Sequence, residues 1–343
     1  ELEQVGTSLG KRKIINLEGA PELKSEEHIV LLRLLMATWV TAYFLSRNTA
    51  VQWASVKMCN VSLQNGNSEL ASFAYVQYGF VCISRMKEFE TGYQFGEIAL
   101  RLSDKYANLY IRGKVYFLFA VMIHHWKKHV SLATEYFKKA YLLSVETGDW
   151  AYAGYCAVNI ITSQVITGHP IQSIYEEAKP YFEFLKNKAD EVLNNCYIPG
   201  GISVLLNLMG RTKDKSSFDC DYFNEEAFHK TYDDQPIALG WFYAAKIRSL
   251  YLMRSFEEGQ KVIDQAETTA IGVHMQVAVP EAYFYSCLML IAVDDQITDP
   301  EKKAYYWSLF DKYQAQMKIW AEKCPDNFEH KYLLVKAEKS RIS

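Results

Sequence analysis

The stretch from Gly6 to Lys11 (GTSLGK) has the residue types of a phosphate-binding loop. In such loops, backbone N–H groups and a lysine hold phosphate oxygens, and a following serine or threonine binds magnesium. Here three residues separate the two glycines where the motif has four, and Arg12 follows the lysine. No apolar strand-like run leads into the stretch. The spacing therefore predicts no nucleotide site.

An aspartate-rich run, Asp294, Asp295 and Asp299, follows an apolar segment. Carboxylates on facing helices can chelate Mg²⁺, and the run resembles the magnesium-diphosphate site of class I terpene synthases. The second metal-binding motif of those enzymes is absent. We therefore expect an acidic loop between helices, with Pro300 opening the next one. A magnesium-dependent all-α enzyme of this type is kept as a third alternative.

The adjacent pair His124 and His125 suggests a metal or a general base. Neighbouring residues on a helix point about 100° apart, so the two rings cannot easily share one ligand site. No glutamate stands at the spacing of a zinc-protease helix, and no His, Cys or Ser has the setting of an activated nucleophile. The sequence predicts no catalytic residue, no metal ligand and no cofactor, and hence no enzyme within this segment.

Composition narrows the classes of partner. The 343 residues include 37 basic and 40 acidic side chains, with no face or tail evidently enriched in Lys and Arg, so no nucleic-acid partner is predicted. The longest apolar run, Ile29–Leu45, is interrupted by Arg33, so no membrane partner is predicted. Seven scattered cysteines without a CxxC pair indicate reduced thiols in a cytoplasmic protein.

Small residues recur with one spacing, and this recurrence predicts the architecture. Two sets are spaced 13 and then 7 positions and are offset by 41: Gly79, Gly92 and Ala99, and Ala120, Ala133 and Ala140. Antiparallel helices approach closely only where side chains are small. A period of about 40 residues is typical of stacked helical hairpins. We predict an all-α fold, a right-handed α-solenoid of antiparallel helix pairs that is tetratricopeptide-like.

Helix periodicity and end signals divide the chain further. The segment 1–24 has no sustained periodicity and is predicted to be irregular, while 25–343 forms the array, less regular at 188–235. A kink or break is expected at Pro180. The predicted helices are Glu26–Ser46, Ala50–Leu63, Ser68–Arg85, Glu88–Tyr106, Ile111–Lys128, Ser131–Glu146, Trp150–Ile166, Ile171–Asn187, Ala189–Gly210 with an interruption, Pro236–Met253, Phe256–Thr269, Val279–Val293, Pro300–Lys323 and one from Pro325 onward.

Two stretches are similar to the helical repeat region of very large multidomain signalling kinases. One is Gly92–Leu102 (GYQFGEIALRL), with Gly79 upstream and His125 and Trp126 downstream; the other is Trp320–Glu338 (WAEKCPDNFEHKYLLVKAE). In that family a protein-kinase-like domain is followed by a STAND-type AAA ATPase, a tetratricopeptide-like array, a GAF domain and a histidine kinase. The resemblance runs from about residue 30 to the end. It implies that the kinase and ATPase sites lie outside this segment.

The resemblance implies a sensor or scaffold arm of a signal-transduction ATPase or kinase, within a two-component system. Its concave face would bind a protein or peptide, or other domains of the same chain. The alternative is a receptor for a small molecule or short peptide, which a deep pocket rimmed by Asn and Arg would favour over a shallow groove. The groove residues that the sequence suggests, which aromatic core packing would also explain, are Tyr75, Tyr78, Tyr116, Phe119, Tyr152, Tyr155 and Asn159.

Overall fold

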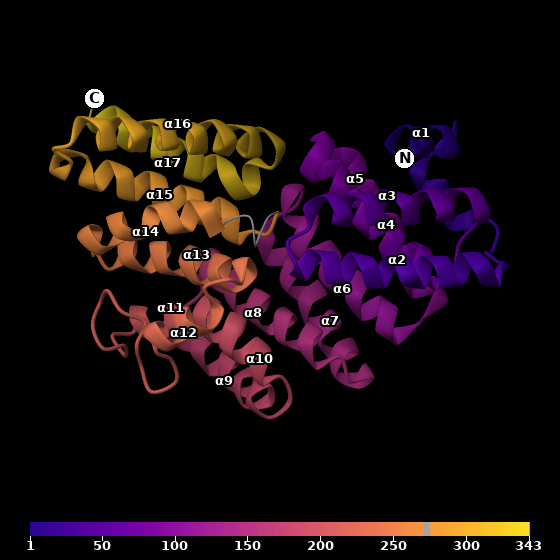
Figure 1. The fold of residues 1–343 in the computed structure, drawn as a ribbon, viewed down its shortest axis with the longest axis horizontal. Helices are drawn as coiled ribbons and strands as arrows, with labels where there is room; N and C mark the ends of the chain where they lie inside the picture. The colour runs from indigo at the N-terminus through magenta and orange to yellow at the C-terminus, as the bar shows by residue number, and fades with distance from the viewer. Residues whose placement is uncertain (270–274, 343) are drawn as a thin grey trace. The chain divides into compact units, whose positions relative to one another are not determined.

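The structure, a computed structural model, describes residues 1–269 and 275–342 (Figure 1). The described residues form helices joined by short loops, with isolated β-bridges in place of strands. The predicted all-α class is therefore confirmed. The chain divides into two compact units, Glu1–Lys127 with Leu132–Cys156, and Lys128–Ser131 with Ala157–Ser343.

The first unit is a set of consecutive helix pairs. Ser25 caps the second helix by accepting the backbone N–H of His28, and Asn108 caps the sixth by accepting that of Ile111. Its helices are α1 (Leu2–Leu9), α2 (Glu26–Phe44), α3 (Asn48–Asn65), α4 (Glu69–Val81), α5 (Phe89–Tyr106), α6 (Leu109–Met122), α7 (Ala133–Thr147) and the first part of α8 (Trp150–Ile166), with a 3-10 helix at Ile14–Gly19, a π-turn at Cys82–Met86 and a 3-10 turn at His124–Trp126.

The helices of a pair touch where the sequence has small residues. A Cβ added at Gly79 on α4 would lie 2.6 Å from the carbonyl oxygen of Gly92 on α5, and the reverse substitution meets the carbonyl of Gly79 at the same distance. In the following pair, Ala120 on α6 and Ala133 on α7 are both buried, and the two helices pack on each other. The predicted packing role of these residues is confirmed.

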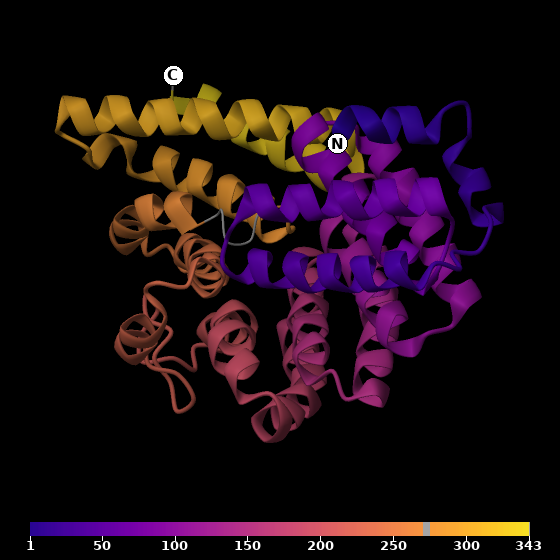
Figure 2. The same ribbon diagram turned by 45° about the vertical axis from the view of Figure 1, so that its right-hand side comes forward.

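The second unit continues from the rest of α8. The last five helices pack on one another in succession (Figure 2), with α13 against α14 and α15, and α15 against α16 and α17. Its elements are α9 (Ile171–Lys188), α10 (Asp190–Val192), a π-helix (Leu193–Ile202), α11 (Ser203–Leu208), α12 (Glu225–Tyr232), α13 (Pro236–Leu252), α14 (Phe256–Thr269), α15 (Ala278–Val293), a 3-10 turn (Asp294–Gln296), α16 (Pro300–Lys323) and α17 (Pro325–Ile342).

Several helix bounds match the prediction, including those of α8, α14 and α16. The prediction of an irregular segment 1–24 was wrong for α1, a short helix with one buried residue, Val5, held by bonds from Lys57 and Asn60 to Glu1. Helix α12, which buries only Phe228, was also missed. Both helices are eight residues long, shorter than the roughly 11 residues over which helical periodicity is recognised.

Prolines change the helices of the second unit less than the sequence predicted. Helix α9 runs through Pro180 without a break. Pro199 lies inside the π-helix, whose wider turns accommodate a residue that has no N–H to donate. There Gly200 lets Trp241 of α13 approach within 3.0 Å of the position a Cβ would take. The irregular stretch 188–235 thus belongs to the interior of one unit, while the division between units falls within α8.

Helix α2 is apolar, but most of its residues are not buried. Among the described residues, it is the helix whose length and composition would allow it to cross a membrane, and 22% of its 18-residue apolar stretch is buried. Leu32, Leu35 and Trp39 form its buried face, which packs on α3. The absence of a membrane partner stays a prediction.

Replacing Gly92 with alanine should destabilise the first unit, because the new Cβ would overlap a backbone carbonyl that cannot rotate away. We expect a loss of about 1–3 kcal/mol, as for other overpacked contacts. Urea denaturation followed by circular dichroism measures it. The control is Gly6→Ala, where a Cβ meets nothing within 4 Å and the helix should be unchanged or stabilised. Equal stability of Gly92→Ala and wild type would contradict the close helix crossing.

Candidate functional site

Three charged side chains meet in the interior of the second unit. Arg248 on α13, Glu281 on α15 and Lys331 on α17 are 5%, 2% and 8% exposed. Side chains of these types are almost never so buried unless they are paired or bind a ligand. Because α15 packs against both α13 and α17, the stacking of helices brings the three together.

The local sequence fixes each of the three on a buried helical face. Arg248 lies between the buried residues Ile247 and Leu250 of α13. Glu281 occupies the first turn of α15, where the helix dipole stabilises a carboxylate. Lys331 follows the buried Phe328 by three positions on α17, so the two share one helical face.

The cluster has two cations for one carboxylate. Arg248 Nη2 lies 3.3 Å from Glu281 Oε2, and Lys331 Nζ forms an ion pair with Glu281 Oε1. The Arg248 guanidinium also stands 5.8 Å from the ring of Tyr285, and Lys331 Nζ 5.6 Å from that of Phe284. Arg248 Nε is buried and makes no hydrogen bond to any residue that the structure describes. Its N–H is therefore a donor without an acceptor.

Burial changes the acidity of both cations. Loss of water lowers the pKa of Arg248, against the opposing effect of Tyr285. Burial also lowers the pKa of Lys331 to about 7, and the positive charge of Arg248 acts in the same direction. Contact with the Glu281 carboxylate acts in the opposite direction, because it favours the charged ammonium. Burial and the charge of Arg248 hold the pKa of Lys331 below that of an exposed lysine.

A cavity of about 450 Å³ opens beside the cluster. Its walls include apolar side chains of several helices, among them Ile166, Leu208 and Leu252. Two exposed histidines, His169 and His330, border its opening. The volume lies within the range of small-molecule sites, which combine apolar walls with a few polar groups. A cavity of this size, with Arg248, Glu281 and Lys331 in its lining, can bind a small ligand.

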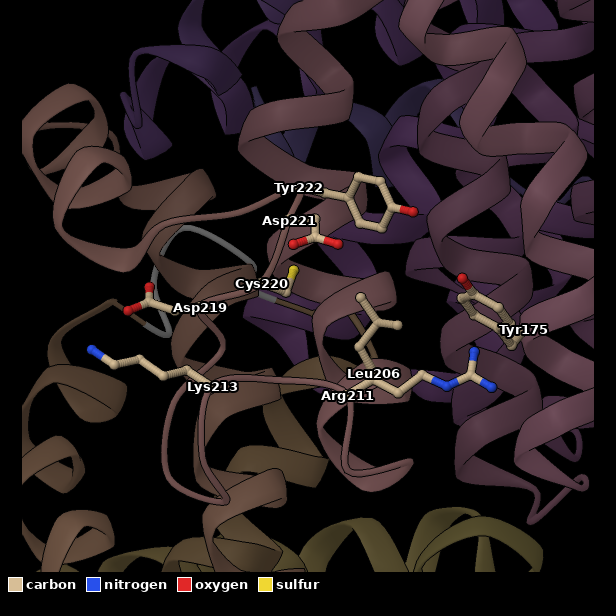
Figure 3. Close-up of a pocket in the computed structure, with 8 residues that line it drawn as sticks. All are labelled: Tyr175, Leu206, Arg211, Lys213, Asp219, Cys220, Asp221 and Tyr222. Atoms are coloured by element: carbon tan, nitrogen blue, oxygen red, sulfur yellow. The ribbon is translucent and has the colours of Figure 1, made fainter.

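A second depression borders α9 and the loop 209–224 (Figure 3), with a volume of about 470 Å³. Figure 3 shows Arg211 reaching toward Tyr175 on one side, while Lys213 and Asp219 lie on the other. The Arg211 guanidinium is 5.3 Å from the centre of the Tyr175 ring. Tyr222, which is 52% exposed, packs edge-on against Phe182. This is an open surface with charges of both signs.

The loop beside this depression is held by one buried amide. Asn207 Nδ2 donates to Thr212 Oγ1 at 3.0 Å and to the carbonyl oxygens of Lys215 and Ser217 at 3.2 and 3.1 Å. Its Oδ1 accepts from Ser249 Oγ at 2.8 Å. Within the stretch 188–235 that was predicted to be less regular, the residues after α11 therefore form a loop held by hydrogen bonds to Asn207.

The residues suggested as groove lining lie in the interior. Six of the seven are buried, at 0–8% exposure, and Tyr155 is half-buried. Tyr75 and Tyr78 pack on Phe95, Tyr116 donates to Asp104, Phe119 packs on Tyr136, and Tyr152 lies under the ammonium of Lys114; Asn159 is buried on α8. The structure thus gives them packing roles rather than an open groove. Helical spacing alone does not distinguish the two.

The other stretches that suggested chemistry also have structural roles. Asp294 bonds Lys303 and the indole N–H of Trp307. Asp299 caps α16 by accepting the backbone N–H of Glu301. His124 and His125 are both buried. Across residues 1–269 and 275–342, no three His, Cys, Asp or Glu side chains are grouped so that they could hold a metal ion.

Sequence reasoning missed the charged cluster, although a signal was present. Arg248, with Lys246 two positions before it, and Glu281 are charges inside long apolar segments, IALGWFYAAKIRSLYL and AVPEAYFYSCLMLIAV. Buried helices tolerate such charges only where a partner faces them.

A stretch of 154 residues, 44% of this chain, is 30% identical to a protein of Dictyostelium discoideum named hybrid signal transduction histidine kinase G. The matched stretch is 4% of that relative's length, so this chain corresponds to a small part of it. The chain is thus similar to a segment of a signalling protein. No family model matches it, and no solved structure does.

The acidity of Lys331 predicts a pH effect on stability. The unfolded chain, where the pKa is near 10.5, binds more protons than the folded protein between pH 7 and that value. The cost of burying the charge is therefore fully present below pH 7 and is relieved as pH rises. Lys331→Met removes this titration, so the stability of wild type relative to the variant should rise with pH by up to about 1.4 kcal/mol per unit.

Urea denaturation of both proteins at pH 7, 8 and 9 measures this difference. Groups remote from Lys331 are common to both proteins and cancel, while Arg248 and Glu281 face Lys331 and respond to its replacement. Parallel pH profiles would contradict the lowered pKa.

Asn207→Ala should release the loop at 211–217. The lost hydrogen bonds leave buried acceptors unsatisfied, and we expect a destabilisation of about 1–3 kcal/mol. Trypsin should also cut faster after Lys213 and Lys215. Asn187→Ala is the matched control, because its exposed amide bonds only the carbonyl of Glu183. Unchanged cleavage in Asn207→Ala would show that other contacts order the loop.

Proposed function

We propose that this chain is a non-catalytic sensor segment of a larger signal-transduction protein, in which the cavity beside Arg248, Glu281 and Lys331 receives a small ligand. The observation that carries the proposal is the charged cluster, which is buried at the wall of a cavity of about 450 Å³. Such a combination of apolar walls with few polar groups is typical of ligand sites. It favours the receptor alternative over a groove for a protein.

The arrangement of the helices supports a sensing role. The three charges lie on α13, α15 and α17, so a ligand that contacts all three would stabilise their packing relative to an open form. In our proposal the helix pairs stack as a tetratricopeptide-like array, and this array transmits the change to output domains elsewhere in the same protein. The similarity to part of a histidine kinase supports phosphotransfer as the output, with its catalytic residues outside this segment. The scattered cysteines without a CxxC pair support a cytoplasmic location for the protein.

A second candidate function is the binding of a protein or peptide at the surface in Figure 3. The exposed ring of Tyr222 and the guanidinium of Arg211 over Tyr175 favour it. Tyrosine and arginine are enriched among the residues that contribute most to protein interfaces. Tyr222→Ala would weaken such an interaction and leave the cavity unaffected.

The test is a thermal-shift screen of this chain against a metabolite library of anionic, neutral and cationic compounds. We expect compounds that raise the melting temperature of wild type in a concentration-dependent way and fail to do so in Leu208→Trp, which fills the cavity without touching the charges. Leu142→Trp, a change at a side chain 66% exposed on α7, is the control and should respond as wild type does. Compounds that stabilise all three proteins equally would contradict a ligand site in this cavity.

A further inference from the structure

We propose that the cavity beside Arg248 recognises a small organic monoanion, a carboxylate carried on an apolar or aromatic body. This inference rests on the proposed function, since it names the ligand class of the same site. It goes beyond that function because it assigns the charge of the ligand and the atoms that would bind it.

The first argument is the unused donor of Arg248. This side chain is 5% exposed and lines the cavity, and its Nε–H meets no acceptor among the described residues. A buried donor left unpaired is energetically unfavourable, and more so when the group is charged. A carboxylate oxygen in the cavity would satisfy it, with the charge-assisted bond that guanidinium groups form best.

The second argument is the balance of charge. Two other lysines of the chain are similarly buried, and each has its own carboxylate: Lys114 pairs with Asp149, and Lys246 with Glu225. At the cavity, Glu281 alone serves both Arg248 and Lys331. When Lys331 is protonated the cluster has a net charge of +1, and a bound carboxylate would favour this protonated form. One further carboxylate would neutralise it, while a cation would add to the excess and a dianion would exceed it.

The third argument is the nature of the walls. Beyond the charges, the cavity is bordered by aliphatic side chains such as Leu208 and Leu252, and by the rings of Phe284 and Tyr285. The last two rings already stand beside Lys331 and Arg248. A ligand with an apolar body would bury its surface there while its carboxylate faces the cations. A small inorganic anion would leave most of the volume unfilled.

The experiment compares carboxylates with neutral amides of the same shape. Phenylacetate, indole-3-acetate and octanoate, and the amide of each, are titrated into this chain by isothermal calorimetry and thermal shift. We expect at least one carboxylate to bind, and its amide to bind at least tenfold more weakly. Phenyl phosphate should bind no better than phenylacetate, because a dianion exceeds the charge of the cluster.

Two variants separate the proposed contact between Arg248 and the carboxylate from the effect of filling the cavity. Arg248→Lys keeps the charge but removes the planar fork of donors, and we expect at least tenfold weaker carboxylate binding. Leu208→Trp should abolish binding while leaving the charged cluster in place. Circular dichroism melts of both variants report whether they fold. If Arg248→Lys does not fold, the carboxylate–amide comparison on wild type decides alone.

The outcomes distinguish this inference from the proposed function. If amides bind as well as carboxylates and Leu208→Trp abolishes both, the cavity is a ligand site without a preference for anions, and this inference alone fails. This inference alone also fails if no carboxylate of the series binds, while other library compounds bind to wild type and not to Leu208→Trp. If no compound of any charge depends on the cavity, both fail.

Discussion

Several helices of this protein are buried nearly all round, and this constraint decides where its polar groups lie. Every residue of α4 from Leu70 to Val81 is buried, and α13 and α15 are buried along most of their length. A polar side chain on such a helix has no water to contact, so it must face a partner on a neighbouring helix. Close helix crossings, such as the one at Gly79 and Gly92, leave little room for water between them.

The constraint is met in different ways at different places. Lys114 has both a carboxylate, Asp149, and the ring of Tyr152, 3.5 Å away. The side-chain amide of Asn207 donates hydrogen bonds to the backbone carbonyl oxygens of Lys215 and Ser217 in the loop that follows α11. Only the Arg248 cluster combines an excess of one charge, an unpaired donor and an adjacent cavity among the residues described. That combination is the basis on which we propose a ligand site here.

In the proposed function the chain acts as a sensor, and this role requires no catalytic residue within it. Its ligand site would draw charges from three helices that are far apart in sequence, so occupancy and helix packing would be linked. The similarity to part of a histidine kinase suits such an input role. The residues of this segment would then determine which ligand is bound, and domains outside it would determine the signalling reaction.

The sequence by itself determined the helical class and much of the helix boundaries. Apolar periodicity, caps and small residues are local signals, and helices such as α8 and α16 lie where those signals place them. The sequence also showed Gly79 and Gly92 as crossing points, because close packing admits few residue types there.

Only the tertiary structure decided which helices are neighbours, and hence what meets at the site. Arg248 and Glu281 are 33 positions apart, and nothing in their local sequence says that α17 supplies Lys331 to the same carboxylate. The aromatic residues suggested as groove lining give a second example. The spacing of Tyr75 and Phe119 along their helices fits a groove and a core equally well. In the structure Tyr75 packs on Phe95 and Phe119 packs on Tyr136, so both lie in the core. Which side of a helix is buried depends on the elements that pack against it, and the local sequence does not show them.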